Sequence, residues 1–233
     1  MIQFSLTILF FCATNLLWSQ ITLPQLQPLQ YNSISFGNAL NFNGTNTYGV
    51  GQVYVQDSIT DFTIEFWVKN TGIDDPNDRI YCSYNNNSFH VGKSASELKL
   101  LFADMGGAAN WSTPCTFESN VWIHFAFVRN GTALTVYKNA VSVANYTVIA
   151  DSVLPTMFRL GSNVDGAGEN GNFTIDELRV WNTIRSRAEI QKYMYSTITP
   201  NVNSGLKLYY RFDQGDANGI NTNERGLYNS AIN

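Results

Sequence analysis

Two adjacent acids, Asp176 and Glu177, lie in a stretch with the pattern of a β-strand, "NFTIDELRVW". Paired carboxyl groups carry out the chemistry of retaining glycosidases, where two of them flank the scissile bond about 5 Å apart. Carboxylate oxygens are also ligands that Ca²⁺ prefers. Neighbouring side chains of a regular strand point to opposite faces of the sheet, so Asp176 and Glu177 cannot flank one bond. The pair therefore indicates a metal ligand or a structural role.

The apolar residues on either side of these two acids change face. Phe173 and Ile175 share one parity along the strand, whereas Leu178 and Val180 share the other. A strand that keeps one face buried can do this only with an extra residue, so the pattern predicts a β-bulge at the two acids. The aspartate then has two alternative roles. It accepts backbone N–H groups at the bulge, or it binds a cation.

Other groups suited to catalysis are few. No further acid pair has strand spacing, apart from loop acids such as Asp74, Asp75 and Asp78. A Ser-His-Asp arrangement can draw only on His90 and His124, the two histidines of the chain. His124 lies in an alternating apolar run, where a structural histidine is the more frequent case. The sequence therefore predicts that the protein is not an enzyme.

Two polar loops carry groups suited to sugar binding. "ADMGGAANW" places Asp104 and Trp111 around glycines, and "SNVDGAGENGN" places Asp165 and Asn170 among glycines and amides. A flat aromatic ring beside hydrogen-bonding groups is what a sugar site needs. We therefore predict a ligand site formed by Asp104, Trp111, Asp165 and Asn170. The alternative is that Trp111 packs inward and that both loops are ordinary turns.

Short strands must position these loops. "FTIEFWVK" (62–69) alternates apolar and polar residues, which predicts a strand with one buried face. "VWIHFAFVRNGTALTVYKN" (121–139) holds two alternating runs around Asn-Gly, a strong hairpin signal. Further runs of this kind are "ELKLLFA", "VSVANYTVI", "MFRLGS" and "LKLYYRF". One helix is predicted, with a capping box formed by Ser186 and Glu189. The pattern predicts an all-β fold, a two-sheet antiparallel jelly-roll sandwich with one short helix near the C-terminal end.

Five stretches follow one another at the spacing of a known family. They are "NALNFNGTNTYGVG", "DFTIEFWVKNTG", "NVWIHFAFVRNGTALTVYKNAVSV", "FRLGSN" and "GNFTIDELRVWNTIRSRAEIQKYM". Together they resemble the laminin G-like jelly-roll domain of secreted bacterial proteins, within the concanavalin A-like lectin and glucanase superfamily. The resemblance covers roughly residues 36–196.

The resemblance also implies site residues. It implies a structural Ca²⁺ that bridges an early glycine turn and a late strand, with Asn43 and Asp176 as the metal ligands. Asn43 stands where many relatives have aspartate. The glucanases of the superfamily carry Glu-x-Asp-x-(x)-Glu on one strand, whereas Thr174, Leu178 and Arg179 stand at the glutamate positions here. The resemblance therefore implies a binding module without glucanase chemistry.

The two ends of the chain predict other segments. Residues 1–19 carry no charged side chain, and their apolar stretch 8–18 is too short to span a bilayer but has the length of a signal-peptide core. We predict a signal peptide over 1–19, a leader or linker over 20–35, the jelly-roll domain over 36–213, and a polar tail over 214–233 that reads as truncated. The mature chain is then secreted or displayed on the cell surface, with no membrane insertion.

The net charge limits the classes of partner that the protein can bind, and the cysteines leave two alternatives open. The 233 residues have a net charge of −4 and no basic tract, which excludes electrostatic capture of nucleic acid. Cys82 and Cys115 either form a disulfide, which export permits, or remain two buried thiols.

Taken together, the sequence predicts an exported, non-catalytic binding or adhesion module that recognises glycans or extracellular proteins through its rim loops. A first alternative is a structural spacer domain of a larger surface protein. A second is a glycoside hydrolase-like enzyme with an atypical active site.

Overall fold

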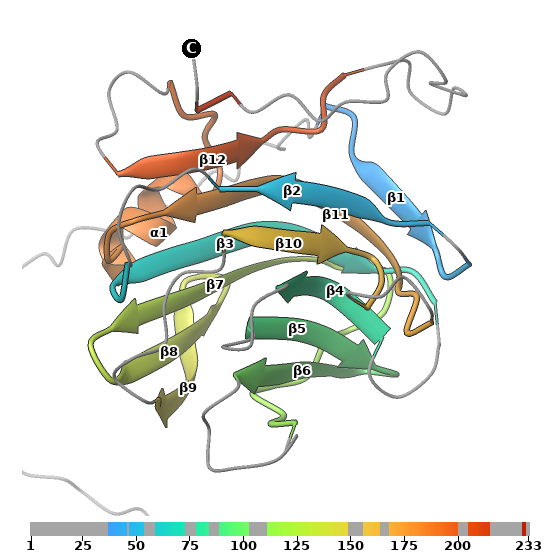
Figure 1. Ribbon diagram of the computed structural model, residues 1–233, viewed down its shortest axis with the longest axis horizontal. Coiled ribbons are helices and arrows are strands. Elements are labelled where there is room, and N and C mark those ends of the chain that lie inside the picture. The colour runs from blue at the N-terminus through green and yellow to red at the C-terminus, as the bar shows by residue number, and fades with distance from the viewer. Residues whose placement is uncertain are drawn as a thin grey trace, which may run out of the picture. The chain divides into compact units, whose positions relative to one another are not determined.

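Two antiparallel sheets form the body of the protein in a computed structural model. It describes residues 37–45, 47–53, 59–72, 78–83, 89–102, 111–148, 156–163, 168–199, 205–214 and 230–231. The seven-stranded sheet contains, in spatial order, β1 (Leu40–Asn43), β11 (Asn172–Trp181), β3 (Phe62–Asn70), β7 (Trp122–Asn130), β8 (Ala133–Lys138) and β9 (Val141–Thr147), while β12 (Leu206–Tyr210) also pairs with β11. The five-stranded sheet contains β2 (Gly49–Gln52), β10 (Met157–Leu160), β4 (Asp78–Ser83), β5 (Phe89–Ser94) and β6 (Glu97–Phe102). Figure 1 shows these strands and the short helix α1 (Arg187–Tyr193), so the predicted all-β sandwich is confirmed.

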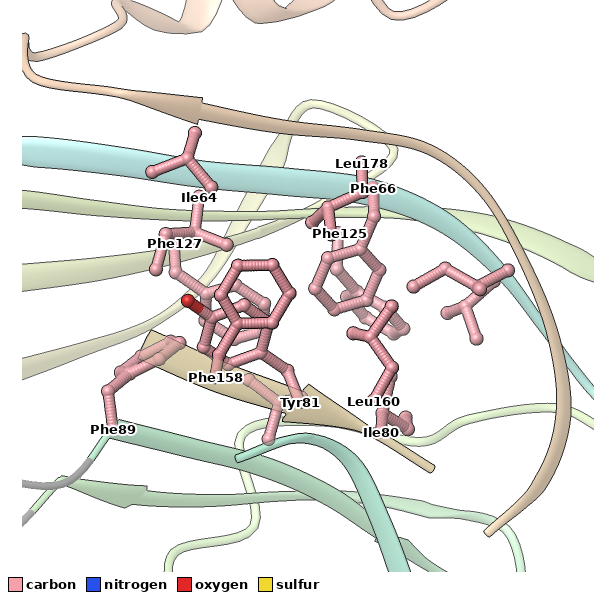
Figure 2. Packing of buried hydrophobic residues seen from close by; sticks show 14 of the residues in the cluster. Ile64, Phe66, Ile80, Tyr81, Phe89, Phe125, Phe127, Phe158, Leu160 and Leu178 are labelled. Carbon is pink, nitrogen blue, oxygen red and sulfur yellow. The ribbon is translucent and has the colours of Figure 1, made fainter. Parts of the chain in front are cut away.

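The core lies between the two sheets. Phe62, Ile64, Phe66 and Val68 alternate along β3 and are all fully buried, as the period of two predicts. In Figure 2, side chains of β3 and β7 point toward those of β4, β5 and β10 across the interior. The aromatic residues pack edge to face or in stacks, for example the Tyr81 and Phe158 rings with centroids 4.7 Å apart. Burial of this apolar surface is the main term that holds the sheets together.

The second face of β3 is also buried, which the prediction of a strand with one buried face did not include. Glu65 and Trp67 lie on this face, and α1 with the turn after it covers them. The predicted capping box begins the helix, because Ser186 and Glu189 each accept from the other's backbone N–H. Its last carbonyls are satisfied from the sheet. The Trp67 indole donates to the Met194 carbonyl oxygen over 2.7 Å.

Arg179 of β11 binds the same end of the helix. Its guanidinium donates to the carbonyl oxygens of Tyr193 at 2.9 Å and Ser196 at 2.8 Å, and it also hydrogen-bonds Glu177. The Nη1 atom of Arg179 lies 3.8 Å from Oε1 of Glu65, whose burial raises its pKa and whose arginine neighbour lowers it. One buried cation thus ties the helix to the sheet and compensates a buried carboxylate.

The β-bulge predicted at Asp176–Glu177 is confirmed. The pairing of β11 with β3 shifts register between Asp176 and Arg179, and Glu177 has a positive φ of 53°. Asp176 accepts a hydrogen bond from the Glu177 backbone N–H at 2.8 Å, which is the first of its two predicted roles. The bulge therefore reconciles the two parities of the strand.

The bulge also divides one edge of β11 between two strands. β1 pairs with residues 172–175 and β12 with residues 178–181, and both run antiparallel to β11. They lie end to end, as two halves of a single strand. The Asn38 side chain, just before β1, donates to the Asp213 carbonyl oxygen at 3.3 Å, so the segments that precede β1 and follow β12 lie side by side.

The two described cysteines are thiols and form no disulfide, which favours the second of the two alternatives for Cys82 and Cys115. The Cys82 sulfur lies 2.8 Å from Nδ1 of His90. Cys115 is half-buried beside the core, and burial raises the pKa of its thiol to about 11.

We expect two carbamidomethyl groups when residues 20–233 are treated with iodoacetamide in denaturant without reductant, because the two cysteines form no disulfide. The measurement is the intact mass. A control sample reduced before alkylation sets the mass of the fully modified chain. An unreduced sample with no added mass would restore the disulfide alternative.

Candidate functional site

Trp111 and Asn170, two of the predicted ligand residues, both contact Arg79 at the outer face of the five-stranded sheet, Trp111 through its ring and Asn170 through its backbone. Ser112 exchanges backbone hydrogen bonds with Leu100 of β6, so the chain runs beside the sheet edge and Trp111 reaches back over it. Residue Asn170 forms an isolated bridge with Arg79 of β4. The other two predicted residues, Asp104 and Asp165, lie outside the described residues.

Arg79 is the centre of this arrangement. Its guanidinium carbon lies 4.3 Å from the centroid of the Trp111 ring, within the range of a cation–π contact. One Nη atom lies 2.8 Å from a carboxylate oxygen of Glu169, and the Arg79 backbone N–H donates to the Glu169 carbonyl oxygen at 2.9 Å. The loop of residues 168–171 and the indole are therefore held by the same arginine.

The indole lies against the sheet at a position where β5 has a glycine. A Cβ at Gly92 of β5 would lie 2.6 Å from the Asp78 carbonyl oxygen and 3.5 Å from a ring carbon of Trp111. His90, two residues earlier on the same face, has its ring centroid 6.2 Å from that of Trp111. Burial and the Arg79 cation lower the pKa of His90 to about 4, so its imidazole is neutral at physiological pH. The indole thus lies as a platform over β4 and β5.

A second arginine–aromatic stack lies on the same face. The Arg159 guanidinium carbon of β10 is 4.5 Å from the centroid of the Tyr48 ring. Tyr48 is 51% exposed and directly precedes β2. Arg159 also donates to the carbonyl oxygen of Asn163 at 3.3 Å. The outer face therefore presents two aromatic rings, each backed by a guanidinium group.

Sequence reasoning missed Arg79, Arg159, Tyr48 and His90 as site residues. The register of β4 against β5 shifts between Arg79 and Tyr81, so Arg79 shares the outer face with Cys82 instead of the inner face with Tyr81. Simple alternation along "RIYCSY" does not show this shift. The exposed aromatic before a glycine-rich strand, "TYGVGQ", is the one signal that could have indicated Tyr48.

The two predicted metal ligands, Asn43 and Asp176, are not brought together. β1 pairs with β11 so that Asn43 lies opposite Asn172, four residues from Asp176 along the strand, or about 13 Å. The Asn43 side-chain oxygen accepts from the Thr45 backbone and from both threonine hydroxyls of its turn, each at 3.0 Å. In the described residues, no group of three or more His, Cys, Asp or Glu side chains is arranged to hold a metal ion.

The acids of the opening motif serve the fold. Asp176 is 2% exposed, and burial, the Glu177 charge and the Asp213 charge raise its pKa to about 8. Glu177 accepts hydrogen bonds from Arg179 and from the Tyr209 hydroxyl. His124 is buried with Nε2 at 3.6 Å from Glu65, and burial lowers its pKa to about 3. Each of these groups is engaged with protein partners.

No helix of the described residues has the length and apolar character that crossing a membrane requires.

Comparisons with known proteins agree with this architecture. The profile of the concanavalin A-like lectin/glucanases superfamily, in its laminin G-like form, matches residues 42–191. The comparison with curated proteins gives no match.

Similar solved structures include a protein from Bacteroides ovatus with a provisional assignment as carbohydrate-binding. It has a TM-score of 0.59 and 20% identity over 74% of this chain and 51% of its own. Trypanosoma rangeli sialidase has a TM-score of 0.55 and 19% identity over 69% of this chain and 28% of its own. The heptameric SAP-like pentraxin of Limulus polyphemus has a TM-score of 0.51 and 14% identity over 68% of this chain and 82% of its own. The chain thus spans about half of the Bacteroides protein and under a third of the sialidase, and the likeness is one of fold.

Proposed function

Because this chain belongs to the concanavalin A-like lectin/glucanase superfamily, we propose that it is a non-catalytic module that binds glycans on the outer face of its five-stranded sheet. The proposal includes export to the cell surface or the medium. The observation that carries it is the Trp111 ring held over the sheet by Arg79. Sugar rings stack their C–H faces on such a platform, and neighbouring polar groups bind the hydroxyls.

Polar groups surround this platform. Glu169 and Asn170 lie on one side of Arg79, and His90 lies beside the indole. The side-chain oxygen of Asn170 is buried and accepts no hydrogen bond from the residues that the structure describes.

A non-catalytic role is supported by the state of the nearby acid. Glycoside cleavage by retention needs two carboxyl groups about 5 Å apart, one of them able to hand over a proton. On this face the described carboxylate beside the platform is that of Glu169, and Arg79 holds it as an ion pair. Its chemistry suits hydrogen bonding to a bound sugar.

We expect residues 20–233 to bind at least one member of a panel of immobilised plant, algal and host-type polysaccharides, and Trp111→Ala to weaken that binding at least about tenfold, or about 1.4 kcal/mol. Trp111→Phe, which keeps a ring, should retain part of the affinity. The assay is run with calcium and again with EDTA, since calcium is the cation that the sequence predicted.

Tyr137→Ala is the matched control, because Tyr137 is a half-buried aromatic residue on β8 of the other sheet. Melting curves of all three variants verify the fold. The proposal would be contradicted if the protein bound none of the polysaccharides, or if Trp111→Ala bound them as tightly as the wild type.

A further inference from the structure

The outer face of the five-stranded sheet holds its two arginine–aromatic stacks at the same level along the strands. Tyr48 precedes Gly49, which pairs with Leu160, and so lies level with Gly161. Gly161 donates its backbone N–H to the Ile80 carbonyl oxygen, beside Arg79. A line across the strands from the first stack therefore reaches the second.

The separation of the stacks follows from the order of the strands. Tyr48 contacts Arg159, so its ring belongs to β2 and β10, whereas Trp111 contacts residues of β4 and β5. The order β2-β10-β4-β5 puts the rings about two strand spacings apart, about 10 Å. A pyranose unit of an extended chain is about as long as one strand spacing, so one sugar cannot cover both rings.

Between the two rings, the residues on this face have short side chains that stay close to the sheet. Cys82 is buried and pairs with Arg159 on one side and with His90 on the other. The Asn163 side chain lies near the Cys82 sulfur, with its oxygen at 3.7 Å. Cys82 and His90 are buried, and Asn163 is partly exposed, so the Asn163 amide is the group of this part of the face that can bind a hydroxyl of a bound chain.

We infer that this face binds an extended oligosaccharide of three or more sugar residues, laid across the strands, with one residue stacked on Trp111 and another on Tyr48. The inference rests on the proposed function and adds to it the class of ligand: the interior of a polysaccharide chain, in contrast to a single terminal sugar. When one ligand contacts both rings, its affinity increases with its length. The second ring then adds binding energy without a second loss of translational freedom.

The test is a chain-length series. The polysaccharide that binds in the panel is cut to purified oligosaccharides of one to six residues, and calorimetry measures the Kd of each. We expect the affinity of the wild type to rise at least about tenfold between two residues and about four, and then to level off. Tyr48→Ala should remove this rise while it changes the Kd of the disaccharide less than about twofold.

Further variants make the result specific. Trp111→Ala should weaken binding at every length, Tyr48→Phe should keep the rise, and Tyr137→Ala should match the wild type. The high exposure of Tyr48 makes loss of folding in Tyr48→Ala unexpected, and a melting curve checks it.

The outcomes separate the two proposals. A failure of every polysaccharide to bind, or binding untouched by Trp111→Ala, overturns the proposed function. A monosaccharide bound as tightly as a hexamer, or a length dependence untouched by Tyr48→Ala, overturns the extended-chain inference while glycan binding at Trp111 stands.

Discussion

Replacing Arg179 with methionine is expected to lower the free energy of unfolding by about 3–5 kcal/mol, the usual cost of breaking a buried ion pair on one side. Arg179 is 1% exposed, and methionine fills much of its volume without its charge. The substitution leaves the buried carboxylate of Glu65 without its nearest arginine, and it removes the donors to the carbonyl oxygens of Tyr193 and Ser196. Urea denaturation followed by tryptophan fluorescence measures the change.

Arg211→Met is the matched control. Arg211 also contacts Glu177, but its side chain is 41% exposed, so we expect a loss of less than about 1 kcal/mol. The double variant Glu65→Leu, Arg179→Met should recover part of the loss, because no buried charge then remains without a partner. A loss below about 1 kcal/mol for Arg179→Met alone would show that the cation contributes little to the attachment of α1.

The stability of the wild type is expected to fall between about pH 4 and pH 8 through Asp176, and Asp176→Asn should remove this part of the fall. Below about pH 4 the carboxyl group is protonated in both the folded and the unfolded chain. As the pH rises, the unfolded chain ionises first, since the folded pKa is about 8, and the stability linked to the bound proton is lost. The shift of the Asp176 pKa sets an upper limit of about 6 kcal/mol on this change in stability.

Asparagine is the suitable substitution, because it keeps an acceptor for the Glu177 backbone N–H and carries no charge. We expect the two proteins to melt together near pH 4 and Asp176→Asn to melt higher at pH 8. Asp176→Ala also lacks the acceptor, so it should melt below Asp176→Asn at every pH. If the melting temperatures of the wild type and Asp176→Asn changed in parallel with pH across this range, the prediction that folded Asp176 keeps its proton would be wrong.

The same melting experiment can also test whether Asp176 binds calcium. A cation bound at Asp176 would hold the carboxylate ionised, so calcium would raise the melting temperature of the wild type at pH 8 and EDTA would reverse it. Asp176→Asn would respond to neither. A calcium response of the wild type alone would assign Asp176 to the second of its predicted roles.

Local rules predicted much of the fold. The parity change around Asp176 located the bulge, Asn130-Gly131 located the hairpin of β7 and β8, and the Ser186 capping box located the start of α1. Each of these signals depends on residues close together in the chain. The burial of Glu65 was not predicted, because the helix that covers it lies more than a hundred residues away in the sequence.

The site was predicted only in part for the same reason. Trp111 and Asn170 stand out as loop residues of the right chemistry, but the sequence does not show that Arg79 joins them. That requires the register shift in β4. The structure does not bring Asn43 and Asp176 together, because in the register of β1 on β11, which the sequence does not show, Asn43 lies opposite Asn172.

The arrangement of β1 and β12 on β11 determines how the domain would respond to tension. Leu40 begins β1 opposite Ile175 and Tyr210 ends β12 opposite Leu178, so the start of β1 and the end of β12 lie next to each other at the bulge. A pulling force applied through residues 37 and 214 would act on the hydrogen bonds next to the bulge first and then peel the two strands away in opposite directions, one pair at a time. Strands that are sheared lengthwise share the force among all their hydrogen bonds, whereas these do not. The hydrogen bonds of β1 and β12 to β11 therefore offer little resistance to a force applied at these two residues.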